Sequence, residues 1–415
     1  MKNTIGLIRD TSLCEKYFID LYGEVTTWQK LRYQKNFDWF KKSFNKDCCY
    51  VASSSGRVEV CGNHTDHQGG KVVSCAISLD TISMFLPTDD GIIRLKSEGY
   101  NDIVIDTAGD TQVKLGTSSA IVKGVVEGFK SKGYKVGGFV ACCTSNVLNG
   151  AGISSSASFE CLVAKILSFL YNDNTVSQED IAKISQFSEN VYFGKPCGLL
   201  DQTAIAFGGL SSLDFFDKNR IDVKTINNAL TDYTFVLMDT GSDHANLTDE
   251  YAAIPVEMKK VAEALGKTRL ADVDEKDFYA NLTTIRQKAG DRAILRAIHY
   301  FDENKRVNNL VNALNINDYD AFLTAIKESG DSSYKLLQNC YVAGSKDQSV
   351  PITLALAAKY LNGGVNRIHG GGFAGTILNV IKNENLDAFI NGVSQFYKKE
   401  AIIVLKVRKY GTIVL

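Results

Sequence analysis

The sequence has almost no net charge. Its 415 residues include 46 lysines and arginines against 47 aspartates and glutamates, a formal net charge of −1, and the basic residues form no clustered run. A protein that holds a nucleic acid or an anionic membrane needs an excess of positive charge on one face. The charge balance therefore gives no electrostatic footprint for either kind of partner.

Long apolar runs are also missing. The N-terminal stretch Met1–Asp10 has too short an apolar core for a signal peptide, and no stretch approaches the roughly 20 apolar residues of a membrane span. The ten cysteines include no C-x-x-C pair and lie mostly inside apolar runs, which is typical of buried, reduced thiols. We therefore expect a cytoplasmic protein.

Proline is scarce, with four residues in the whole chain, and there is no Pro-rich linker, internal repeat or low-complexity tract. A chain of this length exceeds one typical hydrophobic core, so we expect two domains. Aromatic residues at helical spacing predict an N-terminal helical extension over residues 1–45. Strand-like texture then begins a first domain over 46–225, and the strand-like run Tyr233–Asp239 opens a second domain over 226–415.

A glycine turn followed by serines lies at Val147–Ser158. Gly150 and Gly152 let backbone approach an anion closely, and Ser154 can cap the helix that the apolar periodicity of residues 159–170 predicts. The N-terminus of a helix favours a phosphate group. The stretch is either a phosphate cradle or the ordinary start of a core helix, and by itself it does not decide between them.

Two other polar stretches that contain glycine suggest a dinucleotide-binding turn and a zinc site, and the sequence supports neither. Gly370-x-Gly372-x-x-Gly375 has the spacing of a dinucleotide-binding turn, but a β-branched run follows it where a helix is needed. His64 and His67 share one turn, yet zinc would need further ligands at recognisable spacing and none appears.

Four stretches together match a known family. "GRVEVCGNHTDHQGG" (Gly56–Gly70) resembles the galactokinase signature, "GAGISSSAS" (Gly150–Ser158) resembles the phosphate motif of the GHMP small-molecule kinases, and "GGGFAG" (Gly370–Gly375) resembles their third motif. "CGLLDQ" (Cys197–Gln202) resembles the segment that bears the catalytic aspartate of galactokinases. The resemblance implies an α+β fold of two domains, the first like ribosomal protein S5 domain 2 and the second ferredoxin-like, with the active site in the cleft between them.

The implied activity is that of an ATP-dependent sugar-1-kinase. By resemblance Asp201 is the base that takes the proton from the anomeric hydroxyl, and Arg57 stabilises its charged form and the developing charge. Ser156 and Glu189, which stands twelve residues before Asp201, would hold Mg²⁺. The residues implied in nucleotide binding are Gly150, Ala151, Gly152, Ser154, Ser155, Ser156 and Ser158.

The implied sugar pocket departs from the family at two positions. Its residues are Asn63, His64, Asp66, His67, Gly198 and Tyr251, and the family has a glutamate at the first of these positions and a tyrosine at the fourth. Losing a charged acceptor for one hydroxyl costs roughly 1.5–3 kcal/mol. A glutamate kept about 4 Å from a substrate carboxylate would cost about 4 kcal/mol.

Asn63, with a His67 that can carry positive charge, therefore suits a sugar with a carboxylate at C6. "DHQGG" (Asp66–Gly70) also resembles the variant in galacturonokinases. A pocket for galactose, in which Asn63 bonds a neutral O6, stays an equal alternative.

Two other functions compete with a sugar kinase. Some galactokinase relatives are catalytically silent sensors of sugar and ATP, but they lose the Ser-Ala pair that stands here as Ser156-Ala157. A kinase for a non-sugar alcohol such as mevalonate is disfavoured by "NHTD" and "DEY", which resemble the galactokinase branch. The expected partners are ATP and a monosaccharide, without nucleic acid or membrane.

Overall fold

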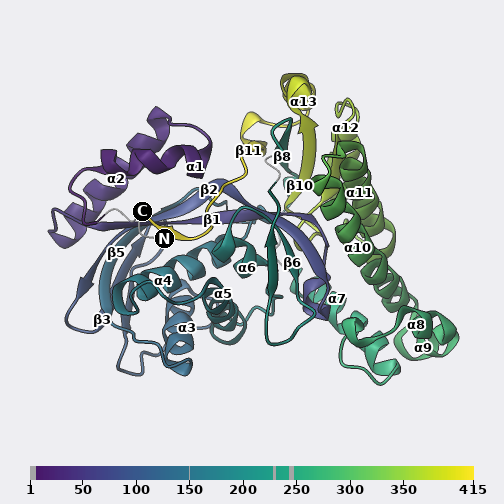
Figure 1. The fold of residues 1–415 in the computed structure, drawn as a ribbon, viewed down its shortest axis with the longest axis horizontal. Helices are drawn as coiled ribbons and strands as arrows, with labels where there is room; N and C mark the ends of the chain where they lie inside the picture. Colours follow the sequence, from purple (N-terminus) through teal and green to yellow (C-terminus); the bar gives the residue numbers. More distant parts are fainter. Residues whose placement is uncertain (1–5, 149, 228–229, 243–246) are drawn as a thin grey trace.

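The computed structural model describes residues 6–148, 150–227, 230–242 and 247–415. Its larger sheet runs in the order β12-β1-β2-β5-β3-β4, and β6 and β7 continue it from β2 (Figure 1). Neighbouring strands are antiparallel except for β3 and β5. The strands are β1 (Tyr50–Cys61), β2 (Lys71–Thr88), β3 (Ile92–Ser97), β4 (Ile103–Asp106), β5 (Gly138–Ser145), β6 (Leu210–Asp214), β7 (Asp222–Thr225) and β12 (Ile413–Val414).

Helices cover both faces of this sheet (Figure 1). Alternate residues of a strand point to opposite faces, so Met84 packs on the N-terminal helices while Phe85 packs in the opposite core. The N-terminal helices are η1 (Thr11–Tyr17), α1 (Phe18–Tyr22) and α2 (Thr27–Phe44). The opposite face carries α3 (Ser118–Ser131), α4 (Ser155–Tyr171), α5 (Gln178–Phe187), η3 (Ser188–Phe193) and α6 (Leu200–Phe207).

The smaller sheet is antiparallel, in the order β11-β8-β10-β9. Leu237 of β8 packs toward α10 and α11, and the neighbouring Met238 packs toward α12 and α13 on the other face. The elements are β8 (Tyr233–Asp239), β9 (Val365–Ile368), β10 (Thr376–Lys382), β11 (Ile402–Leu405), α10 (Asp291–Asn315), α11 (Tyr319–Ser332), η5 (Ser333–Leu337), α12 (Ser349–Ala358) and α13 (Leu386–Val393).

The long β1–β2 hairpin joins the two sheets. Val58 and Val73 of the hairpin share a core with Leu310 of α10, so the tip of the hairpin lies against that helix. The tip contains the turn η2 (Asp66–Gln68). The first half of α10 packs on α7 (Thr248–Ala264), η4 (Leu270–Asp272), α8 (Glu275–Ala280) and α9 (Leu282–Ala289).

The helices η1, α1 and α2 lie within residues 1–45 and share a core with the first sheet, and the expectation that these residues form a separate extension stays a prediction. The expected boundary near residue 225 remains a prediction. The end of the chain returns to the first sheet, because β12 pairs with β1 through Ala52 and Val414. We therefore propose that residues 413–415, at the end of the range 226–415, belong with the first sheet.

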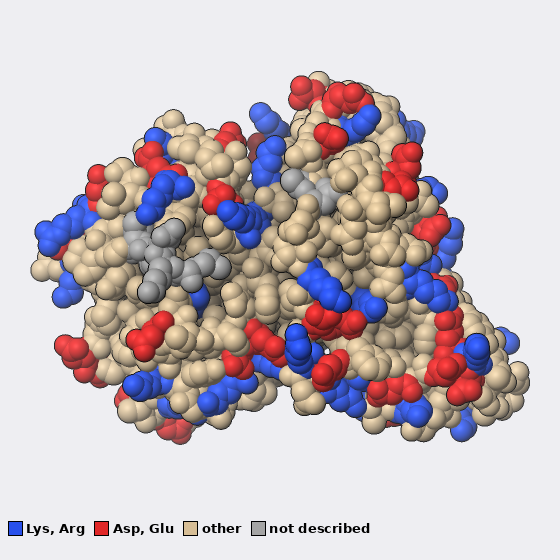
Figure 2. All heavy atoms as spheres, in the orientation of Figure 1, with Lys and Arg blue, Asp and Glu red and all other residues tan. Residues whose placement is uncertain are grey.

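Lysine and arginine lie among aspartate and glutamate on the visible face, and neither sign gathers in one large patch (Figure 2). No helix among the described residues is long and apolar enough to cross a bilayer. The ten cysteines are free thiols, and all but Cys48 and Cys197 are buried. The even charge agrees with the composition, which gives no basic footprint.

Candidate active site

The glycine and serine stretch forms a turn that leads into α4. Gly150, Gly152 and Ser154 all have positive φ, at 75°, 70° and 62°. The prediction that Ser154 caps α4 is wrong: its side chain makes no cap hydrogen bond and instead donates to the Asp201 carboxylate. The left-handed backbone at Ser154 accompanies this change of partner. The first N–H groups of α4 therefore have no side-chain cap, as an anion site at a helix N-terminus requires.

Ser158 does not face this turn. Its side chain is buried, donates to the Ser54 carbonyl oxygen at 2.9 Å and lies 3.0 Å from Thr81 Oγ1. These contacts anchor α4 to β1 and β2. Ser158 is therefore committed to packing, whereas Ser154, Ser155 and Ser156 are partly exposed in the turn.

Asp201 lies at the start of α6 and meets Arg57 of β1. Arg57 Nε donates to Asp201 Oδ1 at 2.8 Å, its Nη2 lies 2.6 Å from the same oxygen, and its Nη1 donates to the Gly152 carbonyl oxygen. Burial opposes ionisation of Asp201, but Arg57 and the Ser154 hydroxyl outweigh it and hold the pKa of the carboxyl below its usual range. The carboxylate is thus ionised, oriented and joined to the glycine turn.

Ser156 and Glu189 form a second polar cluster beside the turn. Ser156 Oγ donates to Glu189 Oε1 at 2.9 Å, and Gln202 Nε2 donates to Glu189 Oε2 at 2.7 Å. The same Gln202 nitrogen donates to Glu160 Oε2 at 3.2 Å. Burial and the Glu189 charge raise the pKa of Glu160 well above its usual range. Lys195 Nζ lies 3.5 Å from Glu189 Oε1.

The predicted sugar-binding turn follows β1. His64 has φ of 56°, and its Nε2 lies 2.9 Å from the Gly371 carbonyl oxygen. Asp66 accepts from the Leu200 backbone N–H at 3.2 Å, and a Cβ at Gly198 would collide with the Asp66 carboxylate. The turn, the Gly198 segment and the third glycine motif therefore meet in space.

Tyr251 closes the group from α7. Its hydroxyl donates to the Gly372 carbonyl oxygen at 2.8 Å, and its ring lies where a Cβ at Gly371 would stand. His64 and Tyr251 thus both contact the third glycine motif. Asp66 belongs to the same turn as His64 and lies against Gly198.

The expectation that His67 carries positive charge is wrong. Both ring nitrogens are enclosed without a hydrogen-bond partner, and burial lowers the pKa of His67 to about 3. Burial likewise lowers the pKa of His64 to about 4. Both imidazoles are therefore neutral and bring no positive charge to the turn.

Asn63 is fully buried and its side chain is occupied by the protein. Its Nδ2 donates to Glu59 Oε2 at 3.2 Å and to the Gly370 carbonyl oxygen at 2.7 Å. Its Oδ1 accepts from Asn339 Nδ2 at 2.8 Å and from Ser333 Oγ at 3.2 Å. An amide has two donor hydrogens and two acceptor lone pairs, and all four are used here. Asn63 therefore ties the turn to the third glycine motif.

The backbone of the turn is held from α10. Glu303 Oε1 accepts from the Gly62 N–H at 2.9 Å, and His299 Nε2 lies 2.8 Å from the Asn63 carbonyl oxygen. Burial opposes the ionisation of Glu303, but His299, Arg367 and Arg306 hold its pKa at about 2. An ionised carboxylate accepting backbone N–H groups fixes the turn more firmly than a neutral group would.

The sequence reading missed Glu160, Gln202, His299 and Glu303. A signal existed for Glu160, because it stands four residues after Ser156 on a helix and so shares its face. No such signal existed for His299 or Glu303, which lie more than 230 residues from the turn they hold.

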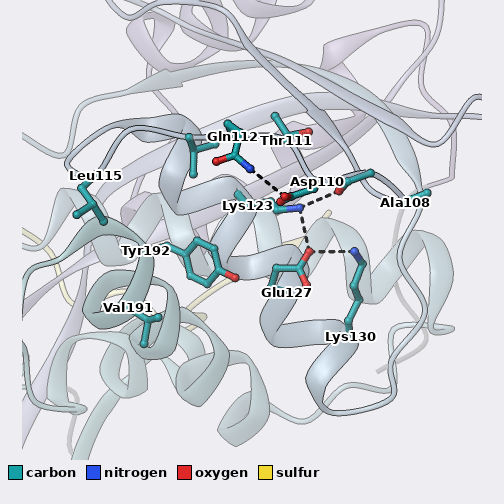
Figure 3. Close-up of a pocket in the computed structure, with 12 residues that line it drawn as sticks. Ala108, Asp110, Thr111, Gln112, Leu115, Lys123, Glu127, Lys130, Val191 and Tyr192 are labelled. Carbon is teal, nitrogen blue, oxygen red and sulfur yellow. Dashed lines mark hydrogen bonds and ion pairs between the residues drawn. The ribbon is translucent and has the colours of Figure 1, made fainter.

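A separate hollow of about 520 Å³ lies between the 108–115 loop, α3 and η3 (Figure 3). Lys123 and Lys130 both reach Glu127 Oε1 there, at 3.1 and 2.9 Å, so this carboxylate offsets one of their two positive charges. Val191 and Tyr192 of η3 form the opposite wall. The hollow contains none of the predicted site residues.

Comparison with known proteins points to one family. Residues 120–209 match the model for the GHMP kinases N terminal domain, and residues 38–85 match the galactokinase galactose-binding signature. A galactokinase of Clostridium perfringens (strain SM101 / Type A) is 30% identical over 369 residues, covering 86% of this chain and 92% of that enzyme. A galactokinase of Clostridium beijerinckii is 28% identical over 366 residues, again covering 86% and 92%.

Solved structures agree. The crystal structure of Lactococcus lactis galactokinase complexed with galactose superposes with a TM-score of 0.80 at 25% identity, over 92% of this chain and 99% of that one. Methanococcus jannaschii mevalonate kinase gives 0.61 at 14% identity, over 86% and 98%, and supports the fold alone. The expected GHMP kinase fold of the α+β class is thus confirmed. The chain belongs to the galactokinase family, and it is a sugar kinase that transfers phosphate to a hydroxyl group.

Proposed function

We propose that this protein transfers the γ-phosphate of ATP to the C1 hydroxyl of galactose. The single observation that carries the proposal is the Asp201 cluster, in which one buried carboxylate bonds Arg57 and Ser154 and adjoins the glycine turn at the start of α4. Phosphoryl transfer depends on a positioned hydroxyl, a phosphate cradle and charge compensation. The cluster supports all three within one site.

In this proposal Asp201 accepts the hydrogen bond of the C1 hydroxyl and takes its proton as the oxygen attacks phosphorus. Arg57 keeps the carboxylate ionised beforehand and offsets charge as the bond to the leaving ADP breaks. Asp66 and His64 orient the sugar hydroxyls, and Tyr251 limits the pocket from α7. The nucleotide phosphates bind at Gly150, Ala151, Gly152, Ser154, Ser155 and Ser156.

The Ser156 and Glu189 pair fits a magnesium ion. Both donors are hard oxygens, they lie 2.9 Å apart, and Glu160 Oε1 behind them is buried without a hydrogen-bond partner. No cluster of three or more His, Cys, Asp or Glu in the described ranges makes a metal site alone, so nucleotide phosphates and water would complete the shell. When bound, the ion neutralises phosphate charge. Ser156 and Glu189 would hold it, and Gln202 orients Glu189.

A neutral sugar fits the pocket better than galacturonate. A substrate carboxylate would lie among neutral imidazoles, because His67 and His64 have pKa values of about 3 and 4. Asn63 has no free donor left to offer it. A carboxylate taken out of water without a cation to pair with is unfavourable by several kcal/mol. Galactose presents a neutral hydroxyl at C6 instead, which avoids this cost.

The test compares kcat/KM for galactose and galacturonate with wild type and Asp201→Asn. We expect galactose to be preferred and Asp201→Asn to lose at least about 10³-fold in kcat, since both the base and the orientation of the hydroxyl are lost. Full activity of a folded Asp201→Asn protein would refute the mechanism. A higher kcat/KM for galacturonate would refute the choice of sugar.

A further inference from the structure

We propose that Lys195, which contacts Glu189, is a phosphate-binding residue of the nucleotide site and moves to the phosphates when metal and nucleotide bind. The proposal rests on the proposed function, because it uses the assigned roles of Glu189 and Asp201. Lys195 follows η3 after one residue, Gly194, and precedes the turn that leads to Asp201.

The backbone of Lys195 is held by a hydrogen bond, whereas its side chain is exposed and makes one long ion pair. Its N–H donates to the Glu189 carbonyl oxygen at 3.1 Å, which ties the residue to the acid. Its Nζ lies 3.5 Å from Glu189 Oε1, while its side chain is 62% exposed. A contact of this length at a partly exposed site is weak, so the ammonium group can exchange partners.

Arg57 cannot take the same role as easily. Its guanidinium is buried and committed to Asp201 and to the Gly152 carbonyl oxygen. The carboxylates of Glu189 and Asp201 offset the charges of Lys195 and Arg57. A nucleotide with its magnesium ion brings a further net negative charge. Lys195 is an exposed cation that can turn toward it, while the metal ion takes the place of its ammonium group beside the buried Glu189 carboxylate.

The proposed exchange predicts opposite effects of Lys195 on the binding of a metal ion alone and on the binding of nucleotide. In the absence of nucleotide, the Lys195 ammonium competes with a metal ion for Glu189. In the presence of nucleotide, the same ammonium supplies charge-assisted hydrogen bonds to phosphate oxygens. Removing the ammonium should therefore strengthen the binding of metal alone and weaken the binding of nucleotide, which loss of local structure would not do.

The experiment measures Mn²⁺ affinity by electron paramagnetic resonance, without nucleotide, and affinity for a non-hydrolysable ATP analogue with Mg²⁺ by calorimetry. For Lys195→Met we expect Mn²⁺ to bind about two- to fivefold more tightly. We expect the analogue to bind at least about tenfold more weakly. Lys195→Arg keeps the charge and should restore analogue affinity to within about threefold of wild type.

Lys259→Met is the matched control. Lys259 Nζ lies 3.4 Å from Glu263 Oε1 and its side chain is 59% exposed, so the substitution removes the same kind of ion pair on α7. Both affinities should stay at the wild-type values. The proposal would be overturned if Lys195→Met had the same affinities as the control for Mn²⁺ and for the analogue, or if both affinities fell. Loss of analogue affinity with unchanged Mn²⁺ affinity would overturn the pairing with Glu189. Full kinase activity of Asp201→Asn would instead refute the proposed function, whatever these affinities show.

Discussion

The substitution Asn63→Asp separates two explanations of position 63. If this residue selects the sugar by charge, a carboxylate there should shift the preference between galacturonate and galactose. If it ties the sugar-binding turn to the third glycine motif, the same change should loosen the turn and leave the preference alone. Aspartate has nearly the same shape as asparagine, so the test changes chemistry and not volume.

The size of the effect follows from the contacts. The substitution keeps an acceptor for Asn339 and Ser333 but removes the two N–H donors that reach Glu59 at 3.2 Å and the Gly370 carbonyl oxygen at 2.7 Å. Each buried acceptor left without its donor costs about 1–3 kcal/mol. Repulsion between two carboxylates 3.2 Å apart is about 5 kcal/mol at an effective dielectric of about 20, and one of them can take up a proton to relieve it.

We therefore expect a loss of about 3–5 kcal/mol in the free energy of unfolding. For a chain of 415 residues this lowers Tm by about 3–6 °C. A displaced Asp66 should raise KM for galactose about tenfold, because misplacement of a positioning group weakens every contact in the bound geometry. The ratio of kcat/KM values for galactose and galacturonate should change by less than about twofold.

Calorimetric unfolding and steady-state kinetics with both sugars provide the measurement. Asn36→Asp is the control, because Asn36 is also buried and donates to the Cys142 carbonyl oxygen at 3.3 Å, far from the site on α2. It should lower Tm and leave both KM values unchanged. An Asn63→Asp protein with wild-type Tm and a tenfold or larger change in the sugar ratio would refute the positioning role and restore selection by charge.

Two further predictions concern buried ion pairs. Arg57→Gln removes the cation that lowers the pKa of Asp201, while burial, which raises that pKa, remains. The acid limb of the kcat/KM profile should therefore move to higher pH. An acid limb at the wild-type pH would show that Asp201 is not the titrating group. Arg32→Met removes the contact of Arg32 Nη1 with Asp80 Oδ1 at 2.6 Å, while Arg408 still reaches Asp80 at 3.1 Å. The free energy of unfolding should fall by about 3 kcal/mol, with kcat/KM within about twofold of wild type; a stable but inactive variant would contradict a purely structural role for this pair.

Local pattern predicted the elements that carry the site. Apolar periodicity identified the helix after the phosphate turn, found as Ser155–Tyr171, and the glycines marked the turn itself. The meeting of Asp201 and Arg57 was expected only from the family resemblance, and the contact of Arg57 with Gly152 was not expected. No rule of local spacing brings Arg57 within 2.8 Å of Asp201.

The side-chain partners were the part that sequence could not give. Ser154 was expected to cap α4, but its backbone is left-handed and its hydroxyl donates to Asp201. His67 was expected to carry charge, but enclosure of both ring nitrogens lowers its pKa to about 3. Asn63 was placed against the sugar, yet Asn339 and Ser333 occupy its carbonyl oxygen. Each outcome depends on residues that arrive from distant segments.

The central claim is that this site phosphorylates galactose at C1. The most direct measurement incubates wild-type enzyme with Mg-ATP and either galactose or galacturonate, and follows the sugar product by ³¹P and ¹H nuclear magnetic resonance. The account predicts galactose 1-phosphate of the α configuration, formed with a higher kcat/KM than galacturonate 1-phosphate. Phosphate at another hydroxyl, no turnover of galactose, or faster turnover of galacturonate would contradict it.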